Sequence, residues 1–156
     1  TLILDTIPEH HSKFWLTPSL IFWVIFLFFF ILQIKQKFND VLYKIVSVTF
    51  FTILGFLGWL FIYFWFGTNH STTYWNLNIL WAMPLNLPIA FFILSNKYRK
   101  WVHQYFFVYR MILVVLLCGW GLNPQQYHIA VVPLLLLAIL LSSKYLTIPT
   151  SKEIDR

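Results

Sequence analysis

Charged side chains are scarce in this chain. Asp, Glu, Lys and Arg make up 10% of its 156 residues, whereas 60% of the residues are apolar. A soluble domain usually carries about 25% charged residues, so the polar surface is too small to face water on all sides. Lipid must therefore be the solvent for much of the chain. The single cysteine, Cys118, excludes an internal disulfide and a cysteine-based metal site.

The side chains that metals, cofactors and hydrolytic chemistry require are also missing. None of the five histidines lies in the middle of an apolar run, and His70 and His128 have no carboxylate near them in the sequence. Neither a G-x-S-x-G elbow nor an H-E-x-x-H pattern occurs. We predict no metal site, no cofactor and no catalytic residue within this chain.

The net charge of +6 does not indicate nucleic acid. The basic residues form short clusters between apolar runs, and they build no groove-sized basic face. Orientation in a membrane explains such clusters better. We therefore expect no nucleic-acid partner, and membrane lipids are the expected surroundings.

Five apolar runs predict an all-α integral membrane protein, a bundle of five transmembrane helices. Each run is close to the roughly 20 residues that cross about 30 Å of hydrocarbon as a helix. The short loops make consecutive spans antiparallel neighbours in a single domain, residues 16–146. An external segment, residues 1–15, precedes it and a cytoplasmic tail, residues 147–156, follows. The predicted spans are residues 16–34, 45–66, 77–95, 105–122 and 129–146.

The basic residues predict the orientation of the bundle. Nine of the eleven lie between the first and second runs, between the third and fourth runs, or around the C-terminus. Positive-inside bias places these nine in the cytoplasm, which gives an N-out, C-in topology. The first twelve residues contain no secretory signal, so we expect an exported segment to precede them in a longer protein. The nine residues are Lys35, Lys37, Lys44, Lys97, Arg99, Lys100, Lys144, Lys152 and Arg156.

Two prolines four residues apart, Pro84 and Pro88, lie inside the third run. Each removes an amide donor and clashes with the carbonyl four residues back, which predicts a proline-kinked third helix. The carbonyls of Leu80 and Pro84 then need partners within the protein. Asn86, an intramembrane polar residue, or a neighbouring helix can supply them. Such a helix marks a functional cavity or serves as structural glue.

Arg110 is the charged residue that lies well inside a predicted span. Its long side chain can reach the cytoplasmic head groups, or it can bind a lipid phosphate or a cluster of buried carbonyls. In the second run, Gly55 and Gly58 are three residues apart and share a helix face. That spacing predicts close packing of another helix.

The outer loop before the third run is dense in small hydrogen-bonding side chains. One interpretation is structural: Ser71, Thr72 or Thr73 caps the following helix, and Trp81 anchors it at the interface. The other is a site for a lipid head group or a protein partner at the outer surface. Its candidate residues are Asn69, His70, Thr73, Asn76, Asn78, Trp81 and Gln126.

Four short stretches carry a resemblance to a known family. Residues 65–70 read WFGTNH and residues 76–87 read NLNILWAMPLNL, and residues 124–127 and 132–134 read PQQY and VPL. These resemble the C-terminal membrane part of the Lnb-type bacterial lipoprotein N-acyltransferases, over about residues 14–145. The resemblance implies a bacterial inner-membrane location, an exterior N-terminus and a role near lipids or lipoproteins.

The same resemblance implies that catalysis resides elsewhere. In that family the catalytic Cys and His belong to an exported, cysteine-peptidase-like domain, so no catalytic residue carries over to this chain. Asn69 also stands where the family has an acidic residue, which argues against a proton-transfer role for Asn69 and His70.

Two functions follow from these observations. In the first, the chain is the membrane half of an enzyme: it anchors an exported acyltransferase domain and presents phospholipid to that domain. Alternatively, it is a non-catalytic accessory subunit that packs through its aromatic faces in a larger inner-membrane complex. A transporter fits less well, because the predicted spans contain no acidic residue for ion coupling and show no repeat.

Overall fold

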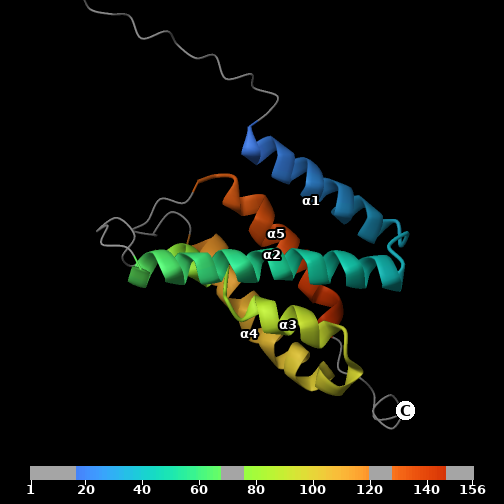
Figure 1. The fold of residues 1–156 in the computed structure, drawn as a ribbon. Helices are drawn as coiled ribbons and strands as arrows, with labels where there is room; N and C mark the ends of the chain where they lie inside the picture. Colours follow the sequence, from blue (N-terminus) through green and yellow to red (C-terminus); the bar gives the residue numbers. More distant parts are fainter. Residues whose placement is uncertain (1–16, 68–75, 120–127, 147–156) are drawn as a thin grey trace, which may run out of the picture.

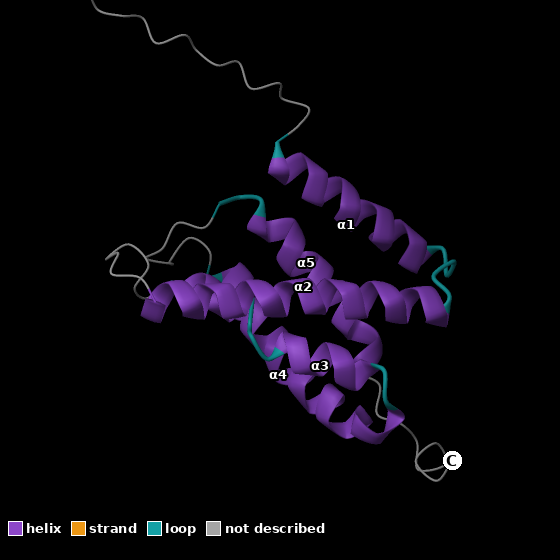
Figure 2. Ribbon diagram, viewed as in Figure 1, coloured by secondary structure: helices purple, strands orange, loops and turns teal. Residues whose placement is uncertain are grey.

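The computed structural model describes residues 17–67, 76–119 and 128–146. Within these ranges the secondary structure is helical and contains no strand (Figure 2). The prediction of an all-α chain is confirmed, and each of the five apolar runs contains an α-helix. In chain order the elements are α1 (Pro18–Ile34), α2 (Asp40–Gly67), the 3₁₀ helix η3 (Leu77–Leu80), α3 (Asn86–Ile93), η4 (Asn96–Tyr98), α4 (Arg99–Cys118), α5 (Val131–Ser142) and η6 (Ser143–Leu146).

Local capping chemistry sets the start of the first two helices. The Thr17 hydroxyl accepts a hydrogen bond from the Leu20 amide, and a proline occupies the first position of α1. After α1 the chain turns at Gln36, whose φ is 53°. The Asn39 side chain then accepts a hydrogen bond from the Leu42 amide at 2.7 Å and begins α2.

Helix α2 is the longest element of the bundle. Its 28 residues span about 42 Å at 1.5 Å per residue, more than the roughly 30 Å of hydrocarbon in a bilayer. It packs against α3 and α5, while α1 lies at the edge beside α5 (Figure 1). The buried residues of α2 recur every three or four positions, as expected for one inward face. They are Tyr43, Ser47, Phe51, Leu54, Gly55 and Gly58.

The outward faces of the bundle are apolar. Helix α1 has no buried residue, although it is almost entirely Phe, Ile and Leu. A water-soluble monomer rarely exposes so much contiguous apolar surface, so lipid is the natural solvent for these faces. Within the described ranges, α2 and α4 are each long and apolar enough to cross a membrane, and α1 and residues 131–146 are shorter apolar helices.

The third apolar run is broken rather than kinked. The prediction was a single helix over residues 77–95, but η3 ends at Leu80, residues 81–85 are not helical, and α3 begins at Asn86. Pro84 lies in the break. Pro88 lies in the first turn of α3, where the missing N–H has no helical partner to lose. Both prolines are accommodated because the chain leaves the helix before reaching them.

The helix ends divide into two groups. At one end, on the right in Figure 1, meet the ends of α1, α3 and η6 and the starts of α2 and α4. Seven of the eight lysine and arginine residues in the described ranges lie there, and we call it the basic end. The opposite end of the bundle contains Asn76 and Asn78, and its described residues include no Lys or Arg. We call it the asparagine end. The residues of the basic end are Lys35, Lys37, Lys44, Lys97, Arg99, Lys100 and Lys144.

Candidate functional site

The break in the third run rests directly on two glycines of α2. A Cβ atom built on Gly58 would lie 2.0 Å from the Ala82 carbonyl oxygen, and one on Gly55 would lie 2.4 Å from the Leu87 nitrogen. Such distances are far below van der Waals contact, so a side chain at either position would displace backbone. Gly58 allows the non-helical backbone to lie against α2, and Gly55 allows the first turn of α3 to do the same.

Two tyrosines of α4 cover the break from the other side. The Tyr109 hydroxyl donates a hydrogen bond to the Trp81 carbonyl oxygen at 2.5 Å, and the Asn86 amide donates to the Tyr109 hydroxyl at 3.4 Å. The Tyr105 hydroxyl donates to the Asn86 side-chain oxygen at 2.8 Å. Asn86 and Tyr109 are fully buried. This cluster gives a freed backbone carbonyl a partner where water is absent.

The donors and acceptors differ in part from the expected ones. The sequence pointed to the carbonyls of Leu80 and Pro84, but the Pro84 oxygen accepts from the Leu87 amide at 3.1 Å within a tight turn. The backbone oxygen that accepts its hydrogen bond from another helix is that of Trp81, and the donor is Tyr109 of α4. Asn86 acts mainly by holding the tyrosine that serves this oxygen.

Asn76 and Asn78 build the asparagine end. The Asn76 side-chain oxygen accepts hydrogen bonds from the Asn78 backbone amide at 3.0 Å and from the Asn78 side-chain amide at 2.7 Å. The Asn78 oxygen accepts from the Trp81 indole N–H at 2.8 Å. Asn76 is therefore the N-cap of η3. The sequence predicts this capping role for Ser71, Thr72 or Thr73 instead.

Trp81 requires a correction. The prediction placed it at the outer surface, as an interface anchor or a lipid contact, but it is only 7% exposed. Its ring packs edge-on against Phe61 of α2. The indole N–H can be buried because Asn78 accepts its hydrogen bond.

The other predicted site residues are only partly brought together. Arg110 is half-buried in α4, eleven residues past the start of that helix and so about 16 Å along its axis. It takes no part in the cluster around Asn86 that the structure describes. Four residues of the predicted outer site lie outside the described residues: Asn69, His70, Thr73 and Gln126.

Tyr105 and Tyr109 are the site residues that the sequence analysis missed. A signal was present, because they are four residues apart in an apolar run and therefore share a helix face. A buried tyrosine hydroxyl usually needs a hydrogen-bond partner, and the proline-interrupted run is the segment with carbonyls to offer. Their rings stack with centroids 5.6 Å apart.

The chemistry of the cluster is positional. Its members are amides and phenols in a dry environment, and the cluster pairs no nucleophile with a base. Among the described residues no group of three or more His, Cys, Asp or Glu side chains could hold a metal ion. These hydrogen bonds hold the broken backbone against α4, and through Trp81 they also hold Asn78 at the asparagine end.

Comparison with known proteins identifies the chain by family. The family model for the Lnb transmembrane domain, a domain of five helices, matches residues 9–153. Neither the curated proteins nor the solved structures contain a match.

Proposed function

The chain belongs to the Lnb transmembrane domain family, and from that premise we propose that it is the membrane part of a bacterial inner-membrane lipoprotein N-acyltransferase. In this proposal the bundle anchors an exported catalytic domain. The asparagine end faces the exterior and presents phospholipid to that domain. Catalysis itself belongs to the exported domain.

The distribution of charge supports this orientation. Seven basic residues lie at one end of the bundle, and the described part of the other end has none. Positive-inside bias assigns the basic end to the cytoplasm. The asparagine end then lies at the exterior leaflet, on the side where an exported domain would work.

The observation that carries the proposal is the construction of the asparagine end. Asn78 is held by Asn76 and Trp81, and Trp81 is tied through its carbonyl to Tyr109 in the core. A binding surface that rests on a rigid core keeps its geometry better than one on a loop. One Asn78 side-chain N–H donates to Asn76, and the second N–H of this amide is a donor that suits the ester and phosphate oxygens of a lipid head group.

A substitution experiment in the full-length protein tests the proposal. Asn78→Ala and His70→Ala are expressed in cells that depend on this enzyme, and the acylated fraction of a reporter lipoprotein is measured by mass spectrometry. We expect about tenfold less acylation, the loss that follows from roughly 1.4 kcal/mol of binding energy. Lys97→Ala, at the basic end, is the control and should acylate normally. Normal acylation by Asn78→Ala and His70→Ala at equal protein levels would refute presentation at the asparagine end.

A second candidate function is that of a non-catalytic accessory subunit in a larger inner-membrane complex. An outward aromatic face on α2 favours it, formed by Phe56, Trp59, Tyr63 and Phe66, with Phe66 80% exposed. Aromatic side chains are enriched at protein interfaces. The mass of the polypeptide in native membranes separates the two functions. A chain of about twice this size supports the enzyme, and a chain of this size that co-purifies with other subunits supports the accessory role.

A further inference from the structure

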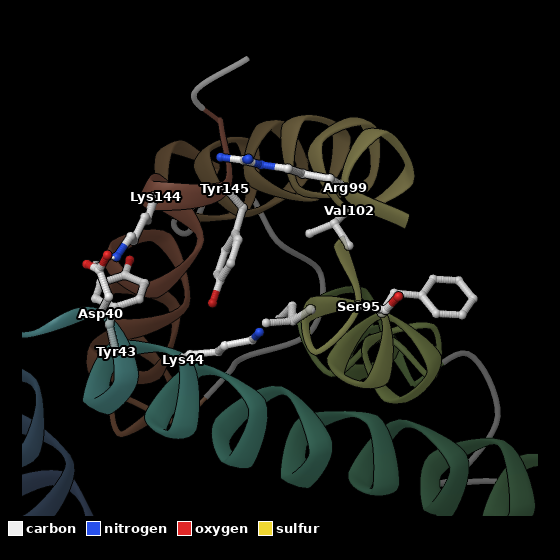
Figure 3. A pocket seen from close by; sticks show the side chains of 10 residues that line it. Asp40, Tyr43, Lys44, Ser95, Arg99, Val102, Lys144 and Tyr145 are labelled. Atoms are coloured by element: carbon white, nitrogen blue, oxygen red, sulfur yellow. Dashed lines mark hydrogen bonds and ion pairs between the residues drawn. The ribbon is translucent and has the colours of Figure 1, made fainter. Parts of the chain in front are cut away.

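A pocket of about 270 Å³ opens at the basic end of the bundle. Three helical elements each contribute a cation to its lining: Lys44 from α2, Arg99 from α4 and Lys144 from η6. Figure 3 shows the Lys44 side chain and the Tyr145 ring directed into the same space, with Arg99 reaching across from α4. Small-molecule pockets usually measure roughly 300–1,000 Å³, so this one suits a head group rather than a whole lipid.

The lining carries an excess of positive charge. Asp40 is its one carboxylate, and it forms an ion pair with Lys144. Asp40 precedes the apolar run that begins at residue 45, and the adjacent ammonium group lowers the pKa of its carboxyl. The carboxylate therefore stays ionised at neutral pH and offsets one of the three cations. The formal charge of the lining is thus three cations against one carboxylate, a balance that attracts an anion.

The donor chemistry of the pocket fits a phosphate. The Lys44 ammonium donates a hydrogen bond to the Leu94 carbonyl oxygen at 3.3 Å, and an ammonium group carries three donors. The guanidinium of Arg99 presents a planar fork of N–H groups, which matches two oxygens of a phosphate. Ser95 and Tyr145 add hydroxyl groups to the same lining. The Tyr43 hydroxyl donates instead to the carbonyl oxygens of Leu140 and Leu141.

The surroundings of the pocket place it at the level of the lipid head groups. Lys44 lies near the start of α2, directly before the apolar run that begins at residue 45, and so at the edge of the hydrocarbon. Trp101 is exposed on the first turn of α4, and tryptophan is enriched at membrane interfaces. The remaining wall is apolar, formed by Phe92, Ile93 and Val102. A cationic rim above an apolar wall matches a head group whose acyl chains continue into the bilayer.

We propose that this pocket binds the phosphate of an anionic phospholipid head group. Basic pockets between membrane helices bind lipid head groups in this way. The site lies at the opposite end of the bundle from the asparagine end, and it does not depend on acylation. Bound lipid would bridge α2, α4 and η6, which also meet at this end through the Asp40–Lys144 ion pair, the His103–Leu146 hydrogen bond and the packing of the Tyr145 ring against Tyr43 and Phe106.

The test measures lipid retention by the purified full chain in detergent, using native mass spectrometry. Phosphatidylglycerol is compared with phosphatidylcholine and with inorganic phosphate. We expect the wild-type chain to retain phosphatidylglycerol at least about tenfold better than phosphatidylcholine, from roughly 1 kcal/mol for each of two cations. Equal retention of the two lipids would overturn the proposal without any variant.

A matched pair of double variants locates the binding. Lys44→Gln with Arg99→Gln removes two charges from the pocket, and we expect the preference for phosphatidylglycerol to disappear. Lys97→Gln with Lys100→Gln removes two charges from the same end without touching the lining, and it should keep the preference. An equal loss in both variants would show a diffuse charge effect and refute the pocket.

Two further arms complete the test. If the pocket variant does not fold, Arg99→Lys is used instead, because it keeps the charge but loses the planar fork of N–H groups. We expect lipid retention to fall threefold or more. Unchanged retention would contradict the binding of phosphate by Arg99. Inorganic phosphate should not displace the lipid at equal concentration, because it cannot use the apolar wall. Displacement at equal concentration would assign the pocket to free phosphate and overturn the lipid proposal.

Discussion

The backbone of Gly58 in α2 lies against the carbonyl group of Ala82, with no room between them for a methyl group. Gly58 is in the middle of a long continuous helix, and Ala82 is in the interrupted third run. This contact explains how a membrane bundle tolerates a non-helical segment. Helix backbone covers the Ala82 carbonyl on one side, and Tyr109 binds the Trp81 carbonyl on the other, so these two polar groups do not meet lipid.

Gly58→Ala should therefore destabilise the bundle although alanine is the better helix former. Overpacking of a tight contact costs about 1–3 kcal/mol, and alanine recovers up to roughly 1 kcal/mol of helix propensity. We expect a net loss of about 1–2 kcal/mol in the free energy of unfolding, measured by steric trapping in bicelles. The control is Gly67→Ala, whose methyl would meet only the side chain of Tyr63, which is 61% exposed. Equal stability of both variants would contradict the tight contact.

Tyr109→Phe should cost about 1–3 kcal/mol of unfolding free energy, because it leaves the buried Trp81 carbonyl without its partner. The Asn86 amide loses an acceptor in the same step. Tyr63→Phe removes a hydroxyl from an exposed tyrosine of α2 and should change stability by less than about 0.5 kcal/mol. The account of the break would be wrong if the two variants unfolded alike.

Asp40→Asn should strengthen anion binding at the basic end. At pH 7 the Asp40 carboxyl is ionised, since Lys144 lowers its pKa, so the substitution removes one negative charge from the pocket lining. We expect retention of phosphatidylglycerol to rise by about threefold to fivefold, in keeping with roughly 1 kcal/mol per charge near a membrane surface. Asn39→Asp, one position earlier, is the matched change in the opposite direction and should weaken retention. Weaker retention by Asp40→Asn would contradict an electrostatic site.

The number and type of the helices were predictable from sequence because each apolar run is long and bounded by polar residues. The break was not. Pro84 and Pro88 indicated a distortion, but whether a proline segment kinks or leaves the helix depends on what packs against it. Here Gly58, some 25 residues earlier in the chain, admits the backbone of the break, and Gly55 admits the first turn of α3; no local pattern records these contacts.

Only the asparagine residues of the candidate site were predictable from the sequence. Asn76, Asn78 and Asn86 stood out because amides are rare in apolar runs. Tyr105 and Tyr109 did not, since tyrosine is common at both membrane interfaces. The basic pocket was likewise hidden, because charge counting explains Lys44, Arg99 and Lys144 by orientation alone. Their convergence on Tyr145 follows from how α2, α4 and η6 pack.

The orientation of the bundle is the claim on which presentation of lipid to an exported domain depends. It is measured by cysteine labelling in intact cells, in a Cys118→Ser background that removes the native thiol. A membrane-impermeant maleimide should modify His70→Cys in intact cells, and it should modify Lys97→Cys only after the membrane is permeabilised. The reverse pattern, with position 97 open and position 70 protected, would contradict the account.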